Sequence, residues 1–137
     1  EDVDAVCVTQ ITSHIFEMVS AVAQKNQRRA LDLYYELLAL KEPPMRILFL
    51  MEREYRILFH VKALMHQGYG KKEIASKAGV PPFAAARYMD QAKKFRPGEL
   101  RGAMEEGADI EQRVKTGLMT DHLAVELFIV KRSGQDG

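Results

Sequence analysis

One long apolar stretch, residues 43–68, constrains the fold of this chain more than any other feature. It is too long for a strand, and its charged residues exclude a membrane span. Pro43 and Pro44 stand at its start, where the backbone N–H groups of a helix have no partner within the helix and proline is tolerated. Gly68 follows at its end as a C-terminal stop. The stretch therefore predicts a single long helix.

The side chains of this helix are unevenly distributed around its axis. The polar ones gather in one narrow arc that contains Glu52, Arg53, Arg56, His60 and Gln67. The remaining circumference is apolar, whereas a surface helix has an apolar stripe on one side only. The pattern predicts the central helix of a bundle, contacted by several neighbours. The residues expected to face the internal core are Ile47, Met51, Leu58 and Met65.

Helical periodicity continues on both sides of the central stretch, and no β-type alternation occurs. Before it we expect a short helix over 2–10, a second from Thr12 or Ser13 to about residue 24, and a third capped by Asn26. After it we expect helices over 71–79, 83–95 and 98–115, and a last one capped by Thr120 or Asp121. The predicted fold is all-α, a bundle of about seven helices around the long central one.

Three of these helices carry specific packing expectations. In helix 83–95 a single row contains Phe83, Ala86, Met89 and Lys93. In helix 98–115 the apolar row is Leu100, Met104, Ala108 (or Ala103) and Val114, and Gly102 and Gly107 weaken the helix or permit close packing. The last helix has Leu123, Leu127 and Val130 on one face and Ala124 and Phe128 on another.

Composition narrows the function classes. The net charge of +1 argues against a stand-alone nucleic-acid binder, which needs a basic field. The lone cysteine, Cys7, excludes an internal disulfide and a multi-cysteine zinc site, and it fits a reducing, cytoplasmic compartment. No signal peptide or membrane span is visible. The chain opens without Met, so we expect a fragment of a longer protein.

The sequence predicts no catalytic, cofactor-binding or metal-binding residue. The four histidines His14, His60, His66 and His122 lack ligand spacing. The residues Glu105, Glu106 and Asp109 are interpreted as a solvated helix face. Gly68-Tyr-Gly-Lys-Lys lacks the spacing of a phosphate-binding loop. An enzyme domain stays open as a third hypothesis, which requires a polar pocket with convergent titratable groups.

A second hypothesis is a helix-turn-helix over residues 71–94, with a local charge of +4. Ile74 and Ala75 would pack in the first helix, Gly79 would make the turn, and Ala85 and Tyr88 would anchor the second helix. Against DNA reading, the turn holds two prolines and the second helix begins with Pro-Phe-Ala-Ala-Ala-Arg, which has almost nothing to contact base edges.

A set of short motifs, taken in order and with their spacing, resembles the C-terminal part of the bacterial DNA polymerase III delta subunit. The motifs are His14-Ile-Phe-Glu-Met-Val, Ala30-Leu-Asp-Leu, Glu42-Pro-Pro-Met-Arg-Ile-Leu, Tyr55-Arg-Ile-Leu, Val61-Lys, Glu73-Ile-Ala, Val80-Pro-Pro-Phe, Gln91-Ala-Lys-Lys-Phe, and Lys115-Thr-Gly ahead of Leu123-Ala-Val-Glu-Leu. One departure is Glu105-Glu-Gly-Ala-Asp-Ile-Glu, which is more acidic than the apolar helix expected there.

The resemblance implies a place in the clamp loader. Delta subunits have an ATPase-like domain, a small helical lid and a helical C-terminal domain, and they do not hydrolyse ATP. Residues 1–10 would be the tail of the lid, and residues 11–137 the C-terminal domain. Such domains form a ring, the collar, which holds the subunits together. The implied partners are the other clamp-loader subunits, with no cofactor and no small-molecule substrate.

The same resemblance suggests where contacts lie. The predicted subunit interface residues are Phe49, Phe59, Tyr88, Phe128 and Ile129, with Tyr34 or Tyr35 as further aromatic candidates. Phe49 and Phe59 border the polar arc of the central helix, which favours contact with another subunit. A collar above the primer–template junction would place Arg113 or Lys115 near the emerging strand.

Overall fold

The computed structural model of the chain is all-helical over residues 2–134, which it describes, with side chains described from residue 11 onward. Its elements are α1 (Asp2–Ala23), α2 (Gln27–Ala39), α3 (Pro44–His66), α4 (Lys71–Ala78), the 3-10 turn η1 (Pro82–Ala84), α5 (Ala85–Ala92), α6 (Pro97–Lys115) and α7 (Asp121–Ser133). The all-α prediction is confirmed. No helix in the described part of the chain is long and apolar enough to cross a membrane.

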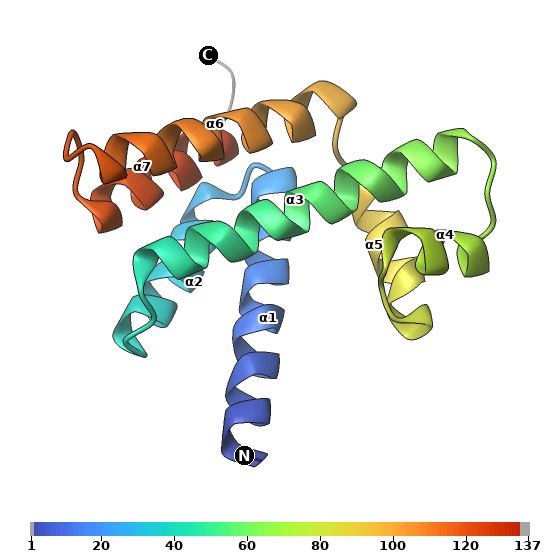
Figure 1. Cartoon of the computed structure of the whole chain (residues 1–137), viewed down its shortest axis with the longest axis horizontal. Coiled ribbons are helices and arrows are strands. Elements are labelled where there is room, and N and C mark those ends of the chain that lie inside the picture. The colour runs from blue at the N-terminus through green and yellow to red at the C-terminus, as the bar shows by residue number, and fades with distance from the viewer. Residues whose placement is uncertain (1, 135–137) are drawn as a thin grey trace.

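The long helix α3 is the centre of the fold. Every other α-helix packs against it, and it runs across the middle of the molecule in Figure 1. Pro43 precedes its first turn in an extended conformation, and Gly68 follows its end with a φ of 91°. Of the residues predicted to face the core, Ile47, Met51 and Leu58 are fully buried and Met65 is half-buried.

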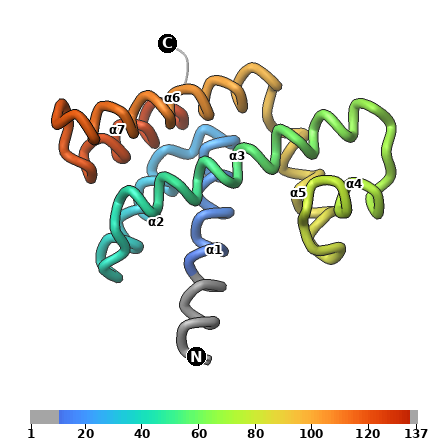
Figure 2. Tube along the Cα trace, in the orientation of Figure 1, coloured from blue at the N-terminus to red at the C-terminus, as the bar shows by residue number. Residues whose placement is uncertain are grey.

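The first helix is continuous, and the break predicted near Thr12 is wrong. α1 runs from Asp2 to Ala23 without interruption, as the trace in Figure 2 shows for its coloured part. Thr and Ser are favoured as caps, but neither forces a helix to begin when no glycine or proline interrupts the preceding turn. The expected lid tail, residues 1–10, has its side chains outside the described residues.

The hairpin of α4 and α5 follows the predicted packing but not the predicted helix length. Ile74, Ala75 and Ala85 are buried, and Gly79 ends α4 in the left-handed conformation with a φ of 73°. The expected helix 83–95 is instead a 3-10 turn followed by the shorter α5. The row of side chains predicted for this helix is not its buried face, because the buried residues are offset from that row by about one position. Phe83, the first residue of the row, is 87% exposed.

Helix α6 packs closely at both glycines, against α3 at Gly107 and against α7 at Gly102, as one of the two interpretations predicted. Gly107 is buried against Glu52, and a Cβ on Gly102 would lie 3.1 Å from Nη1 of Arg132. The buried row contains Leu100, Ala103, Gly107 and Ile110, so Ala103 rather than Ala108 is the inward alanine. Glu52 belongs to the polar arc of α3 by position, yet α6 covers it and the residue is only 6% exposed.

The last helix buries the face opposite to that of Leu123 and Leu127. Its buried residues include Ala124, Val125, Phe128 and Ile129, and the Tyr34 hydroxyl from α2 donates to the His122 carbonyl at 2.8 Å. Leu123 and Leu127 are about half exposed, at 49% and 52%. The molecule thus keeps an apolar strip of α7 on its surface.

Candidate functional site

An apolar surface lies where α6 turns back into α7. Leu118, in the connecting turn, is 75% exposed, and Leu123 and Leu127 follow one turn apart on the free face of α7. Beside Leu127, a groove of about 310 Å³ is lined on its apolar side by Ile110, Met119 and Val130. We call the set Leu118, Met119, Leu123, Leu127 and Val130 the α6–α7 surface.

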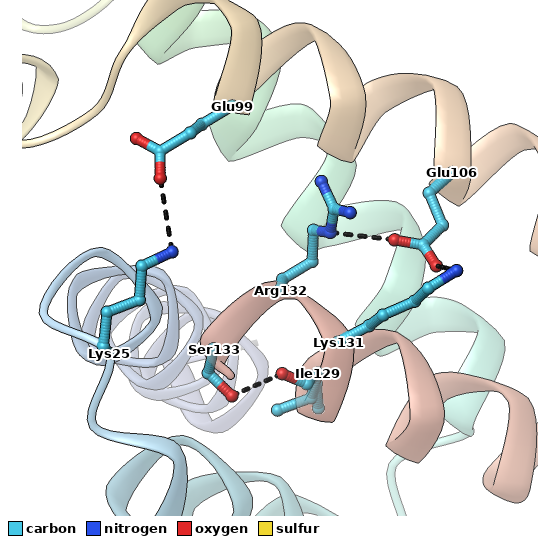
Figure 3. Close-up of polar contacts among 7 residues, drawn as sticks. All are labelled: Lys25, Glu99, Glu106, Ile129, Lys131, Arg132 and Ser133. Carbon is cyan, nitrogen blue, oxygen red and sulfur yellow. Dashed lines mark hydrogen bonds and ion pairs between the residues drawn. The ribbon is translucent and has the colours of Figure 1, made fainter. Parts of the chain in front are cut away.

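Charged side chains surround this surface and are paired with one another. Asp109 Oδ2 and Arg113 Nε are 2.9 Å apart on α6. Figure 3 shows Glu106 between Lys131 Nζ at 3.2 Å and Arg132 Nε at 2.8 Å. An apolar centre with a polar rim is the usual anatomy of a protein–protein contact. The α6–α7 surface has this anatomy.

Two of the predicted interface residues are accessible to different degrees. Phe49 is 46% exposed and shares the outer face of α3 with the exposed residues Arg53 and Arg56. Phe59 is half-buried, and the Arg101 guanidinium lies 5.7 Å from the centre of its ring. Phe49 is therefore accessible on the surface, as its predicted contact role requires. Phe59 instead forms part of a concave surface between α3 and α6.

The other three predicted interface residues are corrected, because this chain buries them itself. Phe128 and Ile129 are fully buried, and Tyr88 is 6% exposed with its hydroxyl 3.0 Å from Oε1 of Glu54. Of the two further tyrosines, Tyr34 is buried and Tyr35 is 44% exposed. A side chain in the core cannot contact a second subunit without local unfolding, so none of these buried residues belongs to a contact surface.

Sequence reasoning did not single out Leu118, Leu123 and Leu127 as exposed residues. The α7 sequence is apolar on two faces, and nothing in its period shows which face the rest of the chain covers. One signal was present in the loop: Leu118 follows Thr116-Gly117, a helix stop, and connecting turns lie mostly at the surface.

A polar cavity of about 170 Å³ lies where the ends of α1 and α7 meet the start of α6. Its charges are paired: Lys25 Nζ lies 3.2 Å from Glu99 Oε2, as Figure 3 shows. Burial raises the pKa of the Tyr55 hydroxyl, which lines this cavity and has no hydrogen-bond partner among the residues that the structure describes. The Arg96 amide and Lys25 hold the pKa of Glu99 below its usual value against the effect of its own burial.

The cations of this cavity are held in ion pairs, Lys25 with Glu99, and Lys131 and Arg132 with Glu106, which suits a structural role. Among the residues that the structure describes, no group of three His, Cys, Asp or Glu side chains is placed to hold a metal ion.

The basic residues predicted to contact nucleic acid differ in whether an acidic side chain already pairs with them. Arg113 pairs with Asp109, whereas Lys115, the last residue of α6, is exposed. In the helix-turn-helix segment, the Arg87 guanidinium lies 4.3 Å from the centre of the Phe16 ring on α1. The arginine of the supposed recognition helix is thus engaged within the domain.

Comparison with known proteins decides the family. The protein-family model described as DNA polymerase III delta subunit, C-terminal domain, matches residues 12–132. The chain belongs to this family. It is 33% identical over 131 residues to DNA polymerase III subunit delta of Bacillus subtilis, a match covering 96% of the chain and 38% of that relative. The chain thus spans well under half the length of that delta subunit.

A solved structure shares the fold of this delta C-terminal domain. The Bacillus subtilis DNA clamp loader delta protein superposes with a TM-score of 0.84 and 33% identity, covering 90% of this chain and 36% of that one. The delta family, and not a helix-turn-helix family, therefore accounts for nearly the whole chain. The prediction of an all-helical fold of clamp-loader type is confirmed.

Proposed function

We propose that this delta C-terminal domain is a non-catalytic assembly module of a bacterial clamp loader, acting in the cytoplasm as part of the DNA polymerase III holoenzyme. Its partners are the C-terminal domains of the other clamp-loader subunits, which together form a collar. The observation that carries the proposal is the family match over residues 12–132. The α6–α7 surface supports it, because it exposes apolar area that the core does not need.

A ring member contacts its two neighbours through two different surfaces. We assign the α6–α7 surface to one neighbour. The outer face of α3 around Phe49 is assigned to the other, since an exposed aromatic among arginines has the composition of interface hot spots. Both areas leave the core intact, as a separable assembly function requires.

Size-exclusion chromatography of the chain with the other clamp-loader subunits of its own species tests the proposal. The unmodified chain is expected to co-elute with them. The double variant Leu123→Asp/Leu127→Asp is expected to lose co-elution while keeping its helical circular dichroism, because both positions are solvent-facing in α7.

Phe83→Asp is the matched control. Phe83 is also a highly exposed apolar residue, but it belongs to η1, which lies at the opposite end of the molecule from the α6–α7 turn (Figure 1). It should co-elute as the unmodified chain does. If the unmodified chain does not co-elute, the assembly function is wrong. If the α7 variant co-elutes normally, the function stands and the surface assignment is wrong.

Contact with DNA is a further part of this proposal, exerted through the assembled complex. Lys115 is the favoured contact because Arg113 already pairs with Asp109. In the complex, Lys115→Gln is expected to weaken primer–template binding and to lower the salt slope of that binding by about one. An unchanged slope would remove Lys115 from the proposal.

A further inference from the structure

A second concave surface lies between the last turns of α3 and the first turns of α6. It encloses about 520 Å³, within the range of roughly 300–1,000 Å³ typical of ligand clefts. In Figure 1, α3 continues past the start of α6 toward α4. The groove is separate from the α6–α7 surface, which lies at the other end of α6.

The lining combines apolar side chains with two cations, Lys62 and Arg101, and the neutral amide Gln67. The floor is formed by Phe59, Met65 and Pro97. The titratable side chains of the lining are Lys62, His66 and Arg101, and none of the lining residues is acidic. A groove whose charges all have one sign, above a low-dielectric floor, focuses the field and attracts ligands of opposite charge.

Contacts inside the domain hold two of these cations in place. Lys62 Nζ donates to the Ala92 carbonyl at 3.0 Å, which ties it to the end of α5. The Arg101 guanidinium lies over the Phe59 ring, with 5.7 Å between them. Neither cation is neutralised by a carboxylate in the described residues. A positioned, uncompensated charge costs less ordering on binding than a free side chain.

We propose that this groove is a docking site for an acidic peptide segment of a partner protein, one with carboxylates flanking a large apolar side chain. The apolar side chain would occupy the floor at Met65 and Pro97, and the carboxylates would meet His66 and Arg101. Arginine is suited to this because its planar guanidinium binds carboxylates in a bidentate manner.

The side chains that line the groove favour a peptide over nucleic acid. Single-stranded nucleic acid binds by stacking bases on open aromatic faces. Phe59 is half-buried and Arg101 lies over its ring, so that face is not free for a base. Aliphatic floor residues such as Met65 suit a side-chain anchor instead. The inference uses the groove alone and does not depend on collar assembly.

Fluorescence anisotropy with labelled peptides tests the inference. The probe is a peptide of about ten residues in which Leu-Phe is flanked by Asp and Glu, and the matched peptide carries Asn and Gln in their place. The acidic peptide should bind the folded chain, and the neutral peptide about tenfold more weakly. Absence of binding by the acidic peptide up to about 1 mM overturns the proposal.

Variants locate the binding. Arg101→Gln and, independently, Ala63→Glu on the exposed rim should each lower the affinity for the acidic peptide about tenfold. Circular dichroism should show that both variants retain their helices. Arg113→Gln, on the same helix and outside the groove, is the control and should leave binding unchanged. Equal losses for Arg101→Gln and Arg113→Gln overturn the site, because they indicate nonspecific attraction. An oligothymidylate that binds more tightly than the peptide and displaces it overturns the choice of ligand.

Discussion

The carboxylate of Glu52 on the central helix lies directly against Gly107 on α6. A Cβ built on Gly107 would be 2.9 Å from Cγ and 3.0 Å from Cδ of Glu52, closer than side chains approach one another. Glu52 is buried at this crossing, with 6% exposure. The glycine in the middle of an otherwise acidic helix is therefore what allows α6 to cover a carboxyl group of α3.

Gly107→Ala should destabilise the domain by about 1–3 kcal/mol, because the added methyl group forces the buried Glu52 side chain or α6 to move. The gain in helix propensity, about 1 kcal/mol, offsets only part of this loss. Urea denaturation followed by circular dichroism measures the difference.

Gly98→Ala is the control for helix propensity. Gly98 lies in the first turn of the same helix, and a Cβ there would meet nothing within 4 Å. Its replacement should leave stability unchanged or raise it by up to about 1 kcal/mol. Equal stabilities for the two variants would show that Glu52 adjusts without cost.

The same carboxyl group predicts a pH dependence of stability. Burial, together with a hydrogen bond to Glu111 and repulsion from it, raises the pKa of Glu52 from 4.5 to about 8. Between these two values the folded chain retains a proton that the unfolded chain releases. The contribution to stability is therefore fully present below pH 4.5 and is lost as the pH rises toward about 8.

Glu52→Gln isolates this effect, because glutamine resembles the protonated acid and does not titrate. The variant should match the unmodified chain near pH 4.5 and exceed its unfolding free energy by about 1–3 kcal/mol at about pH 9. Chemical denaturation across this pH range is the measurement. A constant difference between the two proteins at all pH values would contradict the raised pKa.

The sequence predicted most of the helices because their ends carry strong chemical signals. Pro43 and Pro44 open α3, Gly79 closes α4, and the Asn26 side chain accepts from the Arg29 amide at the start of α2. The break predicted in α1 was wrong because its signal was a threonine or a serine. Either can cap a helix, but neither forces a helix to begin. Signals that forbid a conformation predict boundaries better than signals that merely permit one.

A buried hydrogen bond joins the α4–α5 hairpin to the central helix. The Tyr88 hydroxyl lies 3.0 and 3.1 Å from the two carboxylate oxygens of Glu54, which is 1% exposed. Burial raises the pKa of Glu54, and the hydrogen bond from Tyr88 opposes that rise. Tyr88→Phe should therefore cost about 1–3 kcal/mol of unfolding free energy, since it leaves a buried carboxyl group without its donor.

A double-mutant cycle with Glu54→Gln tests whether this cost belongs to the pair. The coupling energy should be at least about 0.5 kcal/mol. Tyr69→Phe is the control, because the Tyr69 hydroxyl has no hydrogen bond in the described residues and its ring contacts Lys77 instead. Comparable losses for both tyrosine variants would mean that the loss does not depend on the hydrogen bond to Glu54.

The surface was harder to predict than the fold, and α7 shows why. Phe128 and Leu127 are neighbours of similar hydrophobicity, yet one is fully buried and the other is 52% exposed. Periodicity identifies which residues share a face, but the face that enters the core depends on α2, α3 and α6, which pack from far along the chain. In contrast, the exposure of Phe49 was predictable, because this residue borders the polar arc of α3.

This difference within α7 gives the last prediction. Phe128 contacts the Tyr55 ring edge to face, with 6.2 Å between the ring centres, so Phe128→Ala should remove about 3–5 kcal/mol of unfolding free energy. Leu127→Ala should change stability by less than about 1 kcal/mol, because half of that side chain already meets water. Thermal and urea unfolding of the two variants make the comparison. A large loss at Leu127 would show that the face assigned to partner contact is needed for folding, and would withdraw it from the assembly surface.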